Sequence, residues 1–583
     1  MKYSSIPTVQ AIVKHCQAHD IGNIVISPGS RNAPLTIAFT ENPFFSCYSI
    51  VDERCAAFFA LGMAQQLHKP VVVICTSGSA LLNYYPAVAE AYYSEIPLVV
   101  ISADRPCYKI GIGDGQTIKQ QNVYEQQIGY SANLRQDVSH ATEKVLQYRP
   151  EWITADTVEE VQRQVQSHND RELNKALRLA FNSQLPVHIN VPLEEPLYNT
   201  LSESKIEPQI ELISAKKEYK LDLEPQRDIW NKAKRKMILV GVSAPNRVEE
   251  QFLKNLANDP SVLVFTETTS NLNHPNFFNS IDSIIAPIEM HENRQEQFEA
   301  LQPEILVTFG GLIVSKKIKA FLRNYTPKHH WHIGGERAND TFFCLELHFK
   351  LPVDRFFDEM YYTNSSVESS YFNKWNQVKK NYLLKRTTYL QQIPFSDFSV
   401  FDKILKGIPQ GYLVQLANSS TVRYAQLFEM DRTLKVFCNR GTSGIDGSSS
   451  TAIGASLISE KPTLLLTGDL SFFYDSNALW NNYMRKDFRI IVVNNSGGGI
   501  FRILPGKEDS ENFKTFFETR HSLTAEQLCL MHNMEYKSAN SAESVQNELN
   551  SFYNISSRPT LLEIFTPTIM NDKILTDYFR FIS

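Results

Sequence analysis

The chain lacks any Cys-x-x-Cys pair, although it contains eight cysteines among its 583 residues. Cysteine pairs of that spacing are the usual sign of a zinc site or a redox-active dithiol, so neither kind of site is predicted. The cysteines are scattered along the chain, and most are expected to be small buried side chains in a reducing compartment.

Long apolar runs are also absent. No segment reaches the roughly 18 consecutive apolar residues that a membrane-crossing helix needs. The N-terminal segment MKYSSIPTVQAIVKHC lacks the charged start and apolar run of a secretion signal. The sequence therefore predicts a cytoplasmic protein that does not insert into membranes.

A strong charge of either sign is missing. The formal net charge is −5, with 43% hydrophobic and 21% charged residues, which is ordinary for globular proteins. Without a basic excess, no nucleic-acid partner is predicted. The length of 583 residues exceeds what one core supports, so the usual domain size predicts roughly three or four domains.

A glycine-rich dinucleotide turn is absent too. Apolar runs at 237–242, 262–265 and 305–311 predict strands in the middle of the chain, but the first continues as LVGVSAPN and not as G-x-G-x-x-G. The SGGG stretch at 496–499 does not have the fingerprint spacing either. A nicotinamide- or flavin-dependent oxidoreductase is therefore disfavoured, and the middle part is interpreted as a structural α/β domain.

What the chain does contain is a repeated alternation of short apolar runs and helix-length segments. In the first part, strands are predicted at 23–28, 71–76 and 97–103, with helices through the 50s and 60s and over 81–93. This rhythm predicts an α/β fold with three serial doubly wound domains and mainly parallel sheets. The expected boundaries are a first domain over 1–196, a linker over 197–227, a middle domain over 228–360, a connecting segment over 361–400 and a last domain over 401–583.

The most informative stretch runs from 463 to 504. Apolar runs at 463–467 and 490–493 predict two buried parallel strands, followed by Gly468-Asp469 and by Asn494-Asn495. The loops after both strands should open at the same edge of the sheet, where such folds bind ligands. Because Mg2+ prefers oxygen ligands and keeps phosphate oxygens in its shell, we expect Asp469, Asn495 and a carbonyl near Gly497 to hold a metal diphosphate.

Simpler interpretations of these residues stay open. Asp469 can cap the following helix, and Asn494-Asn495 can merely turn the chain. Glu53, at a strand end before the apolar helix in SIVDERCAAFFALGMA, can be a first-turn charge paired with Arg54.

The motif around Asp469 is similar to the signature of thiamine diphosphate enzymes, GDG followed some two dozen residues later by NN. Here Asn495 lies 26 residues after Asp469, and Leu470 stands where the second glycine is expected. Longer segments resemble the family of 2-succinyl-5-enolpyruvyl-6-hydroxy-3-cyclohexene-1-carboxylate synthases, thiamine diphosphate enzymes of menaquinone synthesis. These segments are ISPGSRNAPL (26–35), VDERCAAFFALGMAQ (51–65), TSGSALLNYYPAVAEAYYSEIPLVVISADRP (76–106) and NRGTSGIDGSSSTAIGAS (439–456). The resemblance covers the first and last domains in order and the middle domain only loosely.

This resemblance implies an enzyme that uses thiamine diphosphate and Mg2+, with Mn2+ as an alternative metal. The first domain would bind the aminopyrimidine and the last domain the diphosphate. Glu53 would bond to N1′ of the aminopyrimidine, which works best in a dry pocket that raises the pKa of the acid. The implied cofactor-binding residues are Glu53, Asn418, Ser419, Ser443, Gly444, Ile445, Gly468, Asp469, Leu470, Asn495 and Ile500.

The resemblance also implies a transferase of the carboligase type. It would decarboxylate 2-oxoglutarate and add the remaining succinyl unit to isochorismate. Both substrates are polyanions, which arginine forks can bind bidentately. The residues expected to be catalytic are Glu53, Arg31, Gln116, Arg423 and Arg440. Those expected to bind substrate are Ser30, Arg31, Arg105, Gln116, Lys316, Lys317, Ser419, Arg423, Arg440, Phe501 and Leu504.

Each of these positions has an ordinary alternative. The arginines can form surface ion pairs, Lys316 and Lys317 can be solvated residues of a helix start, and Asn418 and Ser419 can be helix caps. Apolar residues such as Ile445 can simply belong to the core. In this superfamily the pyrimidine domain of one chain meets the diphosphate domain of another, so a homodimer or homotetramer with active sites at the subunit interface is implied.

Two other functions compete with this prediction. Another thiamine diphosphate-dependent 2-oxoacid decarboxylase or carboligase, acting on a substrate with a single carboxylate, would not need the cations Arg31 and Arg105. A non-catalytic paralogue with the same fold would be expected to lack Glu53, Asp469 or Asn495, and all three are present.

Overall fold

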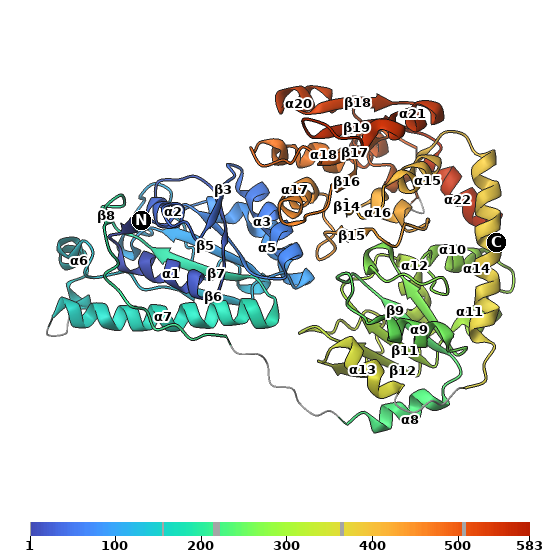
Figure 1. Ribbon diagram of the computed structural model, residues 1–583, viewed down its shortest axis with the longest axis horizontal. Coiled ribbons are helices and arrows are strands. Elements are labelled where there is room, and N and C mark those ends of the chain that lie inside the picture. Colours follow the sequence, from blue (N-terminus) through green and yellow to red (C-terminus); the bar gives the residue numbers. More distant parts are fainter. Residues whose placement is uncertain (1, 154–156, 214–221, 362–366, 504–508) are drawn as a thin grey trace. The chain divides into compact units, whose positions relative to one another are not determined.

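The computed structural model describes residues 2–153, 157–213, 222–361, 367–503 and 509–583. By their internal contacts these residues form two compact units. Unit 1 comprises Met1–Glu218, Ser449–Glu460 and Asp475–Met484, and unit 2 comprises Tyr219–Ser448, Lys461–Tyr474 and Arg485–Ser583. Each unit is built on parallel sheets with helices packed against them (Figure 1).

Unit 1 contains one parallel sheet with the order β3-β2-β4-β5-β7-β6. Its strands are β2 (Asn23–Ile26), β3 (Ser46–Ser49), β4 (Val71–Cys75), β5 (Leu98–Asp104), β6 (Tyr130–Asn133) and β7 (Val187–Pro192). Every residue of the central strands β4 and β5 is buried, because helices cover both faces of such a sheet. The short strands β1 (Tyr3–Ser4) and β8 (Thr200–Leu201) pair antiparallel beside it.

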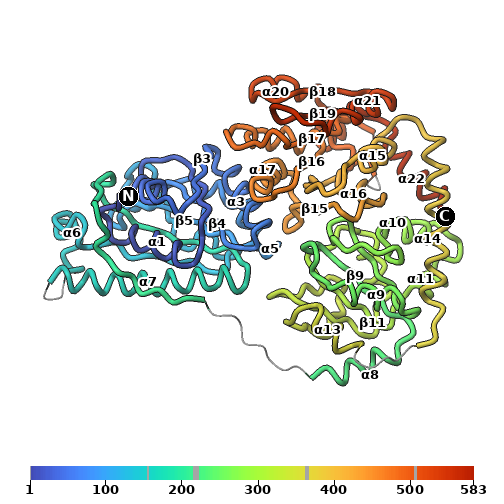
Figure 2. Tube along the Cα trace, viewed as in Figure 1, coloured from blue at the N-terminus to red at the C-terminus, as the bar shows by residue number. Residues whose placement is uncertain are grey.

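The helices of unit 1 pack against this sheet or against one another. They are α1 (Pro7–Ala18), α2 (Ala33–Thr40), α3 (Glu53–Leu67), α4 (Ala80–Asn83), α5 (Tyr85–Ser94), α6 (Thr142–Tyr148) and α7 (Val158–Ser183), with most of α17 (Ser448–Ile458). The long helix α7 packs against α1, β6 and β7 (Figure 2). Part of the expected linker runs over this helix, since Asn174 donates to the carbonyl of Gln209 and accepts from the backbone NH of Glu211.

Unit 2 contains two parallel sheets, with the orders β10-β9-β11-β12-β13 and β15-β14-β16-β17-β19-β18. The strands of the first are β9 (Lys236–Val240), β10 (Val262–Thr266), β11 (Ile305–Phe309), β12 (His329–Ile333) and β13 (Leu347–Phe349). Those of the second are β14 (Leu413–Leu416), β15 (Lys435–Cys438), β16 (Thr463–Gly468), β17 (Arg489–Asn494), β18 (Glu535–Ala539) and β19 (Thr560–Phe565).

The helices of unit 2 surround both sheets. Those of the middle part are α8 (Glu224–Lys232), α9 (Glu250–Asn258), α10 (Asp282–Met290), α11 (Arg294–Leu301), α12 (Lys316–Asn324) and α13 (Val353–Met360). Those of the last part are α15 (Asp397–Gly407), α16 (Ser420–Ala425), α18 (Asp469–Tyr474), α19 (Glu511–Phe516), α20 (Glu526–Met531), α21 (Ala542–Phe552) and α22 (Asn571–Ile582). Helix α14 (Tyr371–Gln392) fills most of the expected connecting segment and packs against both α22 and β10 (Figure 1).

One hydrophobic cluster runs through both sheets of unit 2. It includes Met237 and Phe265 from the first sheet, Tyr382 from α14, and Val414 and Ile491 from the second sheet. This shared core explains why the middle and last parts of the chain form one unit by contacts. The predicted α/β fold with parallel sheets is confirmed, whereas the five domain boundaries stay predictions.

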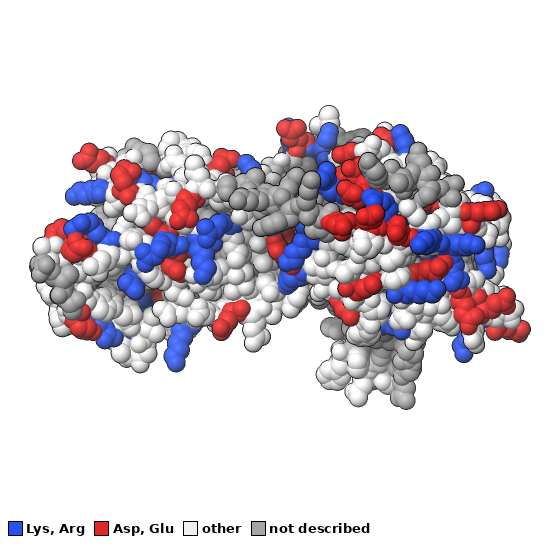
Figure 3. All heavy atoms as spheres, turned by 90° about the horizontal axis from the view of Figure 1, so that it is seen from below, with Lys and Arg blue, Asp and Glu red and all other residues white. Residues whose placement is uncertain are grey.

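Charged side chains of both signs are interspersed on the face of the molecule in Figure 3. Among the described residues of this face, no broad area is basic in the way that phosphate backbones require. The absence of a nucleic-acid partner remains a prediction from composition.

Candidate functional site

Asp469 and Asn495 lie at adjacent strand ends, as the sequence predicts. Strands β16 and β17 pair in parallel, with Gly468 opposite Val493. The Oδ2 atom of Asp469 accepts a hydrogen bond from the backbone NH of Gly497 at 2.9 Å and lies 3.1 Å from Nε2 of His521. Its Oδ1 atom accepts from the backbone NH of the next residue, Leu470, at 2.7 Å. Asp469 is the first residue of α18, so it also places a negative charge in the first turn of this helix.

The side chain of Asn495 is held from one side only. Its Nδ2 donates to Oδ2 of Asp397 at 3.0 Å, while its buried Oδ1 finds no donor among the residues that the structure describes. A buried acceptor without a donor is costly unless a cation or water completes it. A buried amide oxygen of this kind fits a hard divalent metal.

Gly497, the third predicted ligand, has a backbone that requires glycine. Its φ is +148°, and a Cβ there would lie 2.6 Å from the carbonyl oxygen of Glu518. The described residues contain no group of three or more His, Cys, Asp or Glu side chains arranged for a metal. A metal at this edge would therefore depend on amide and carbonyl oxygens and on its ligand's phosphates, as the prediction requires.

Three serines on the loops of the same sheet have left-handed backbones. They are Ser419 after β14, Ser443 after β15 and Ser496 after β17, with φ of +67°, +63° and +64°. Non-glycine residues in this region cost roughly 1 kcal/mol or more each, and such strain clusters at functional sites. No local sequence pattern predicts the positive φ angles of these three serines.

The remaining predicted cofactor residues line these loops. Asn418 donates to the carbonyls of Asn439 and Gly444, each at 2.7 Å, and so holds the loop after β15. Ile445 leaves 37% of its surface exposed, as an apolar side chain that contacts a ligand would. Ile500 and Phe501 lie half-buried in the turn Gly499–Ile503. Leu504 lies outside the described residues.

Arg423 and Arg440 come close together in unit 2. Burial lowers the pKa of Arg423, and the charge of Arg440 lowers it further. Buried Glu267, which the sequence did not single out, accepts hydrogen bonds from the backbone NH groups of Val314 and Ser315. Burial raises its pKa to about 7, against these bonds and the charge of Arg440. Two guanidinium groups that repel one another would favour an anion that bridges them.

The lysines of α12 differ in exposure and in their charged partners. Lys316 is exposed, and Lys317 forms an ion pair with Glu289. Lys319 is half-buried, as Lys317 is; burial lowers its pKa, Glu267 opposes this shift, and Arg440 adds to it. Its position three residues after Lys316, on the same helix face, was the available signal for this residue.

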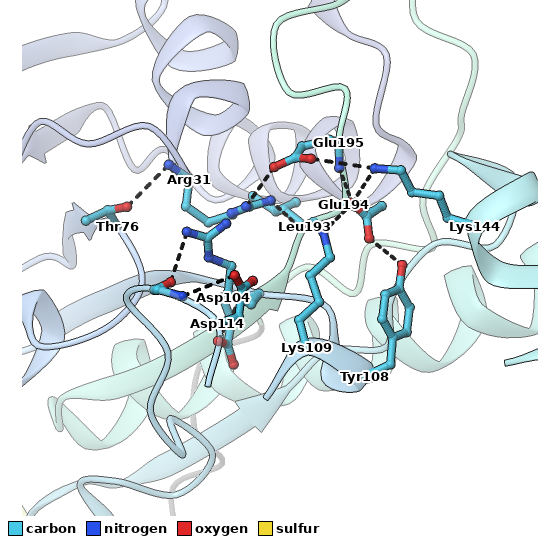
Figure 4. Close-up of polar contacts among 12 residues, drawn as sticks. Arg31, Thr76, Asp104, Tyr108, Lys109, Asp114, Lys144, Leu193, Glu194 and Glu195 are labelled. Carbon is cyan, nitrogen blue, oxygen red and sulfur yellow. Dashed lines mark hydrogen bonds and ion pairs between the residues drawn. The ribbon is translucent and has the colours of Figure 1, made fainter. Parts of the chain in front are cut away.

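In unit 1, Arg31 is buried and already has an acidic neighbour. Its guanidinium donates to the carbonyl of Leu193 and to Oε1 of Glu195, both at 3.0 Å (Figure 4). Burial lowers the pKa of Arg31 and the charge of Arg105 adds to this effect, whereas Glu195 opposes it. Arg105 donates to the carbonyl of Gly115 at 3.1 Å. Ser30, which precedes Arg31, and Gln116, which follows Gly115, are both exposed.

Beside Arg31 lies a cluster that sequence reasoning missed. The buried carboxylate of Glu194 accepts from the Tyr108 hydroxyl and from the ammonium groups of Lys109 and Lys144, at 3.1 and 3.0 Å for the lysines (Figure 4). Burial alone would raise the pKa of Glu194, but these hydrogen bonds outweigh it and lower the pKa to about 2. The pair Glu194-Glu195 in VPLEEP was the only sequence signal.

Glu53 is the first residue of α3 but does not cap it. The cap is Asp52, whose Oδ1 accepts from the backbone NH of Cys55 at 3.1 Å. Arg54, the suggested partner of Glu53, lies 3.8 Å from Asp475. Glu53 is half-buried, and its Oε2 accepts a long 3.4 Å bond from Asn83. Its carboxylate therefore stays available for a ligand.

Comparison with known proteins decides the family. The family models described as "Thiamine pyrophosphate enzyme, N-terminal TPP binding domain" and "Thiamine pyrophosphate enzyme, C-terminal TPP binding domain" match residues 7–129 and 418–564. Curated proteins named 2-succinyl-5-enolpyruvyl-6-hydroxy-3-cyclohexene-1-carboxylate synthase are similar over the whole chain. The protein from Christiangramia forsetii is 55% identical, that from Flavobacterium johnsoniae 52% and that from Flavobacterium psychrophilum 50%. Each alignment covers 100% of this chain and 100% of the relative. The chain belongs to this synthase family.

Membership in the synthase family confirms the resemblance that the motifs indicated. The two matched domains make the chain a thiamine diphosphate enzyme, with Glu53 in the first matched range and Asp469 and Asn495 in the second. Among the described residues, no helix combines the length and the hydropathy that crossing a bilayer requires.

Proposed function

We propose that the chain decarboxylates 2-oxoglutarate and adds the remaining succinyl unit to isochorismate, with thiamine diphosphate and Mg2+. The product would be 2-succinyl-5-enolpyruvyl-6-hydroxy-3-cyclohexene-1-carboxylate, the compound in the name of its relatives. In the cell this reaction would belong to menaquinone synthesis in the cytoplasm.

The observation that supports the metal and diphosphate part best is the buried Oδ1 of Asn495, for which the described residues supply no donor. It lies on the loop that also carries Gly497, whose backbone NH is bonded to Asp469. We propose that Asp469, Asn495 and the carbonyl of Gly497 hold Mg2+, with Mn2+ as an alternative, and that Ser419 and its neighbours contact the diphosphate.

Thiamine diphosphate, when bound, supplies the nucleophilic carbon that a 2-oxo acid needs in order to lose CO2. The role of Glu53 would be to hold a proton at N1′ of the aminopyrimidine. Its carboxylate is suited to this because Asp52 does the capping of α3. Ile445, exposed at 37%, would contact the cofactor through its apolar side chain.

The substrate carboxylates need cations that position them. Arg423 and Arg440 would bind one carboxylate, and Arg31 and Arg105 another, since paired guanidinium groups favour a bridging anion. Further proposed substrate contacts are Ser30, Gln116, Lys316, Lys317 and Phe501. At Arg31 a substrate would join or replace Glu195, which now occupies one side of the guanidinium.

We also propose that the protein is a homodimer or homotetramer whose active sites lie between two copies. Glu53 belongs to unit 1, whereas Asp469 and Asn495 belong to unit 2. A closed symmetric pair would supply each cofactor with Glu53 from one copy and the metal ligands from the other.

The reaction can be tested with purified protein, thiamine diphosphate, Mg2+, 2-oxoglutarate and isochorismate. We expect one ring adduct per CO2 released, and loss of both products when EDTA removes the metal. CO2 release without an adduct would instead favour a plain 2-oxoacid decarboxylase, and turnover of pyruvate in preference to 2-oxoglutarate would favour a carboligase of the acetolactate synthase type.

A further inference from the structure

The side chain of Asn495 can serve a metal only in one of its two amide orientations. A half-turn about the last bond exchanges Oδ1 and Nδ2 with almost no change in shape, so packing alone hardly distinguishes them. Only the oxygen can bind a cation, because the amide nitrogen is a donor. Something must therefore hold Nδ2 away from the metal side.

Asp397 does this in the structure. Its Oδ2 accepts the hydrogen bond from Nδ2 of Asn495 at 3.0 Å, and the opposite atom, Oδ1, is the buried one that finds no donor among the described residues. An ionised carboxylate only accepts hydrogen bonds, so it can face the nitrogen of the amide but not the oxygen. Asp397 therefore selects the orientation that points Oδ1 away from itself.

Asp397 is itself held from several sides. It is 2% exposed, at the first position of α15. Its other oxygen, Oδ1, accepts from the hydroxyl of Thr566 at 2.5 Å, and its backbone NH donates to Oδ1 of Asn571 at 2.9 Å. Thr566 is the residue after β19, and Asn571 is the first residue of α22 (Figure 1). The carboxylate has little freedom to follow a rotating amide.

The neighbouring Asn494, the last residue of β17, offers a comparison. Its Nδ2 donates to Oε1 of Glu563 at 2.8 Å and to the carbonyl of Leu523 at 3.0 Å, and its Oδ1 accepts from the backbone NH of Ser496. Both ends of that amide are used within the protein. Both amides donate to a carboxylate. The oxygen of Asn494 also has a donor, whereas the oxygen of Asn495 has none among the described residues and can accept from a ligand.

We propose that Asp397 is the positioning residue of the metal site, which it serves by fixing the amide of Asn495 with Oδ1 toward the cation. This inference rests on the proposed function of Asn495 as a metal ligand. Partners that orient a metal ligand typically contribute about 10- to 100-fold in metal affinity.

The first test is the variant D397N, which keeps the size of the side chain but adds a donor. The new amide can donate to Asn495, whose Nδ2 would then turn toward the metal. We expect the concentration of Mg2+ needed for half-maximal thiamine diphosphate binding to rise about 10- to 100-fold. The readout is calorimetric titration of cofactor binding, with Mn2+ electron paramagnetic resonance as a direct measure of the metal.

The matched control is E563Q, which removes the corresponding carboxylate from Asn494. Thermal unfolding without cofactor reports the damage that each variant does to the fold. We expect D397N to weaken metal binding far more than E563Q does. Equal effects of the two variants on Mg2+ affinity would contradict the proposal.

The double variant D397N/N495D tests the orientation itself. In it the donor and the acceptor exchange places: the new amide donates to the new carboxylate, whose second oxygen is left for the metal. We expect Mg2+ affinity to return to within several-fold of wild type, whereas N495D alone places two buried carboxylates together and binds poorly. The double variant keeps the hydrogen bond, so it remains informative even if D397N folds badly.

A double variant that folds but does not recover Mg2+ binding would overturn the proposal, as would wild-type affinity in D397N. Failure of the proposed function looks different. In that case the wild-type protein itself would bind thiamine diphosphate without any dependence on Mg2+, and no variant would change that dependence.

Discussion

Glu53 is the residue whose proposed role would separate a cofactor-binding fold from a working enzyme. Its helix is capped by Asp52, so the carboxylate of Glu53 is not needed for capping. In the variant E53Q we expect Mg2+ and thiamine diphosphate to bind as in wild type, while turnover falls about 10²- to 10⁴-fold, the range for loss of a proton-transfer group. Calorimetry and the CO2 assay measure the two effects separately.

The control for that change is E41Q, at an exposed glutamate that pairs only loosely with Lys2, at 3.5 Å. It should leave both cofactor binding and turnover within a few-fold of wild type. Turnover by E53Q at the wild-type rate would show that another group handles the proton at N1′.

Glu194 is a residue whose effect lies in stability. Its pKa in the folded protein is about 2, below the ordinary value of 4.5, so it stabilises the fold above pH 4.5 and loses this contribution as the pH falls toward 2. We expect E194Q to be less stable than wild type at pH 7 by on the order of 2 kcal/mol, with the difference shrinking between pH 4.5 and pH 2. Urea unfolding over this pH range measures it.

The neighbouring variant E195Q is the matched control for Glu194. The Glu195 side chain is 48% exposed, whereas that of Glu194 is 1% exposed. Solvent screens exposed ion pairs, so E195Q should cost clearly less. A stability difference between wild type and E194Q that did not change from pH 7 to pH 2 would mean that lost packing, and not lost charge, is responsible.

At the scale of elements, α3 and α17 approach each other closely within unit 1. A Cβ at Gly62 would lie 2.0 Å from the carbonyl oxygen of Thr451, and one at Gly454 would lie 2.0 Å from that of Phe59. Although alanine favours helices over glycine by about 1 kcal/mol, backbone atoms at this distance cannot yield as side chains do. We expect G62A and G454A each to destabilise the protein by about 1–3 kcal/mol or more.

Thermal unfolding of these variants should be compared with that of G407A. Gly407 ends α15, and a Cβ there would meet its nearest atom, in Leu549, at an ordinary 3.5 Å. G407A should therefore unfold at or above the wild-type temperature. An unchanged midpoint in G62A would mean that the two helices can separate at little cost.

Elements with strong local patterns could be predicted from the sequence. The runs at 463–467 and 490–493 became β16 (Thr463–Gly468) and β17 (Arg489–Asn494), because fully buried parallel strands are continuous apolar runs. Short strands such as β6, with the sequence YSAN, were missed, because only one of its four residues is fully buried and it lacks such a run.

The residues of the candidate site also differ in whether the sequence could predict them. Residues within motifs, such as Asp469 and Asn495, could be named in advance, because their spacing along the chain sets their meeting at one sheet edge. Asp397 and Glu267 could not, because their partners lie far away in sequence: Thr566 for Asp397, and Val314 for Glu267. A single buried acid has no local signature until the fold brings its donors to it.

At the scale of the whole molecule, the proposal that active sites lie between two copies makes a distinct prediction. Glu53 is in unit 1 and Asp469 in unit 2, and either E53Q or D469A should inactivate a protein made of one kind of chain. Suppose that the two variants are produced together with different tags and that mixed dimers are purified by both tags in turn. If each site takes Glu53 from one chain and Asp469 from the other, one of the two sites carries both changes and the other carries neither.

The mixed dimer should then show about half of the wild-type turnover per dimer, as the symmetry of a closed pair requires. The same double purification of E53Q chains carrying the two tags is the control and should stay inactive. If both groups came from one chain, each site of the mixed dimer would have one defect, and turnover would stay near zero. That outcome, or failure of the two tags to copurify, would contradict an active site shared between subunits, because recovery depends on one intact site being assembled from two different chains.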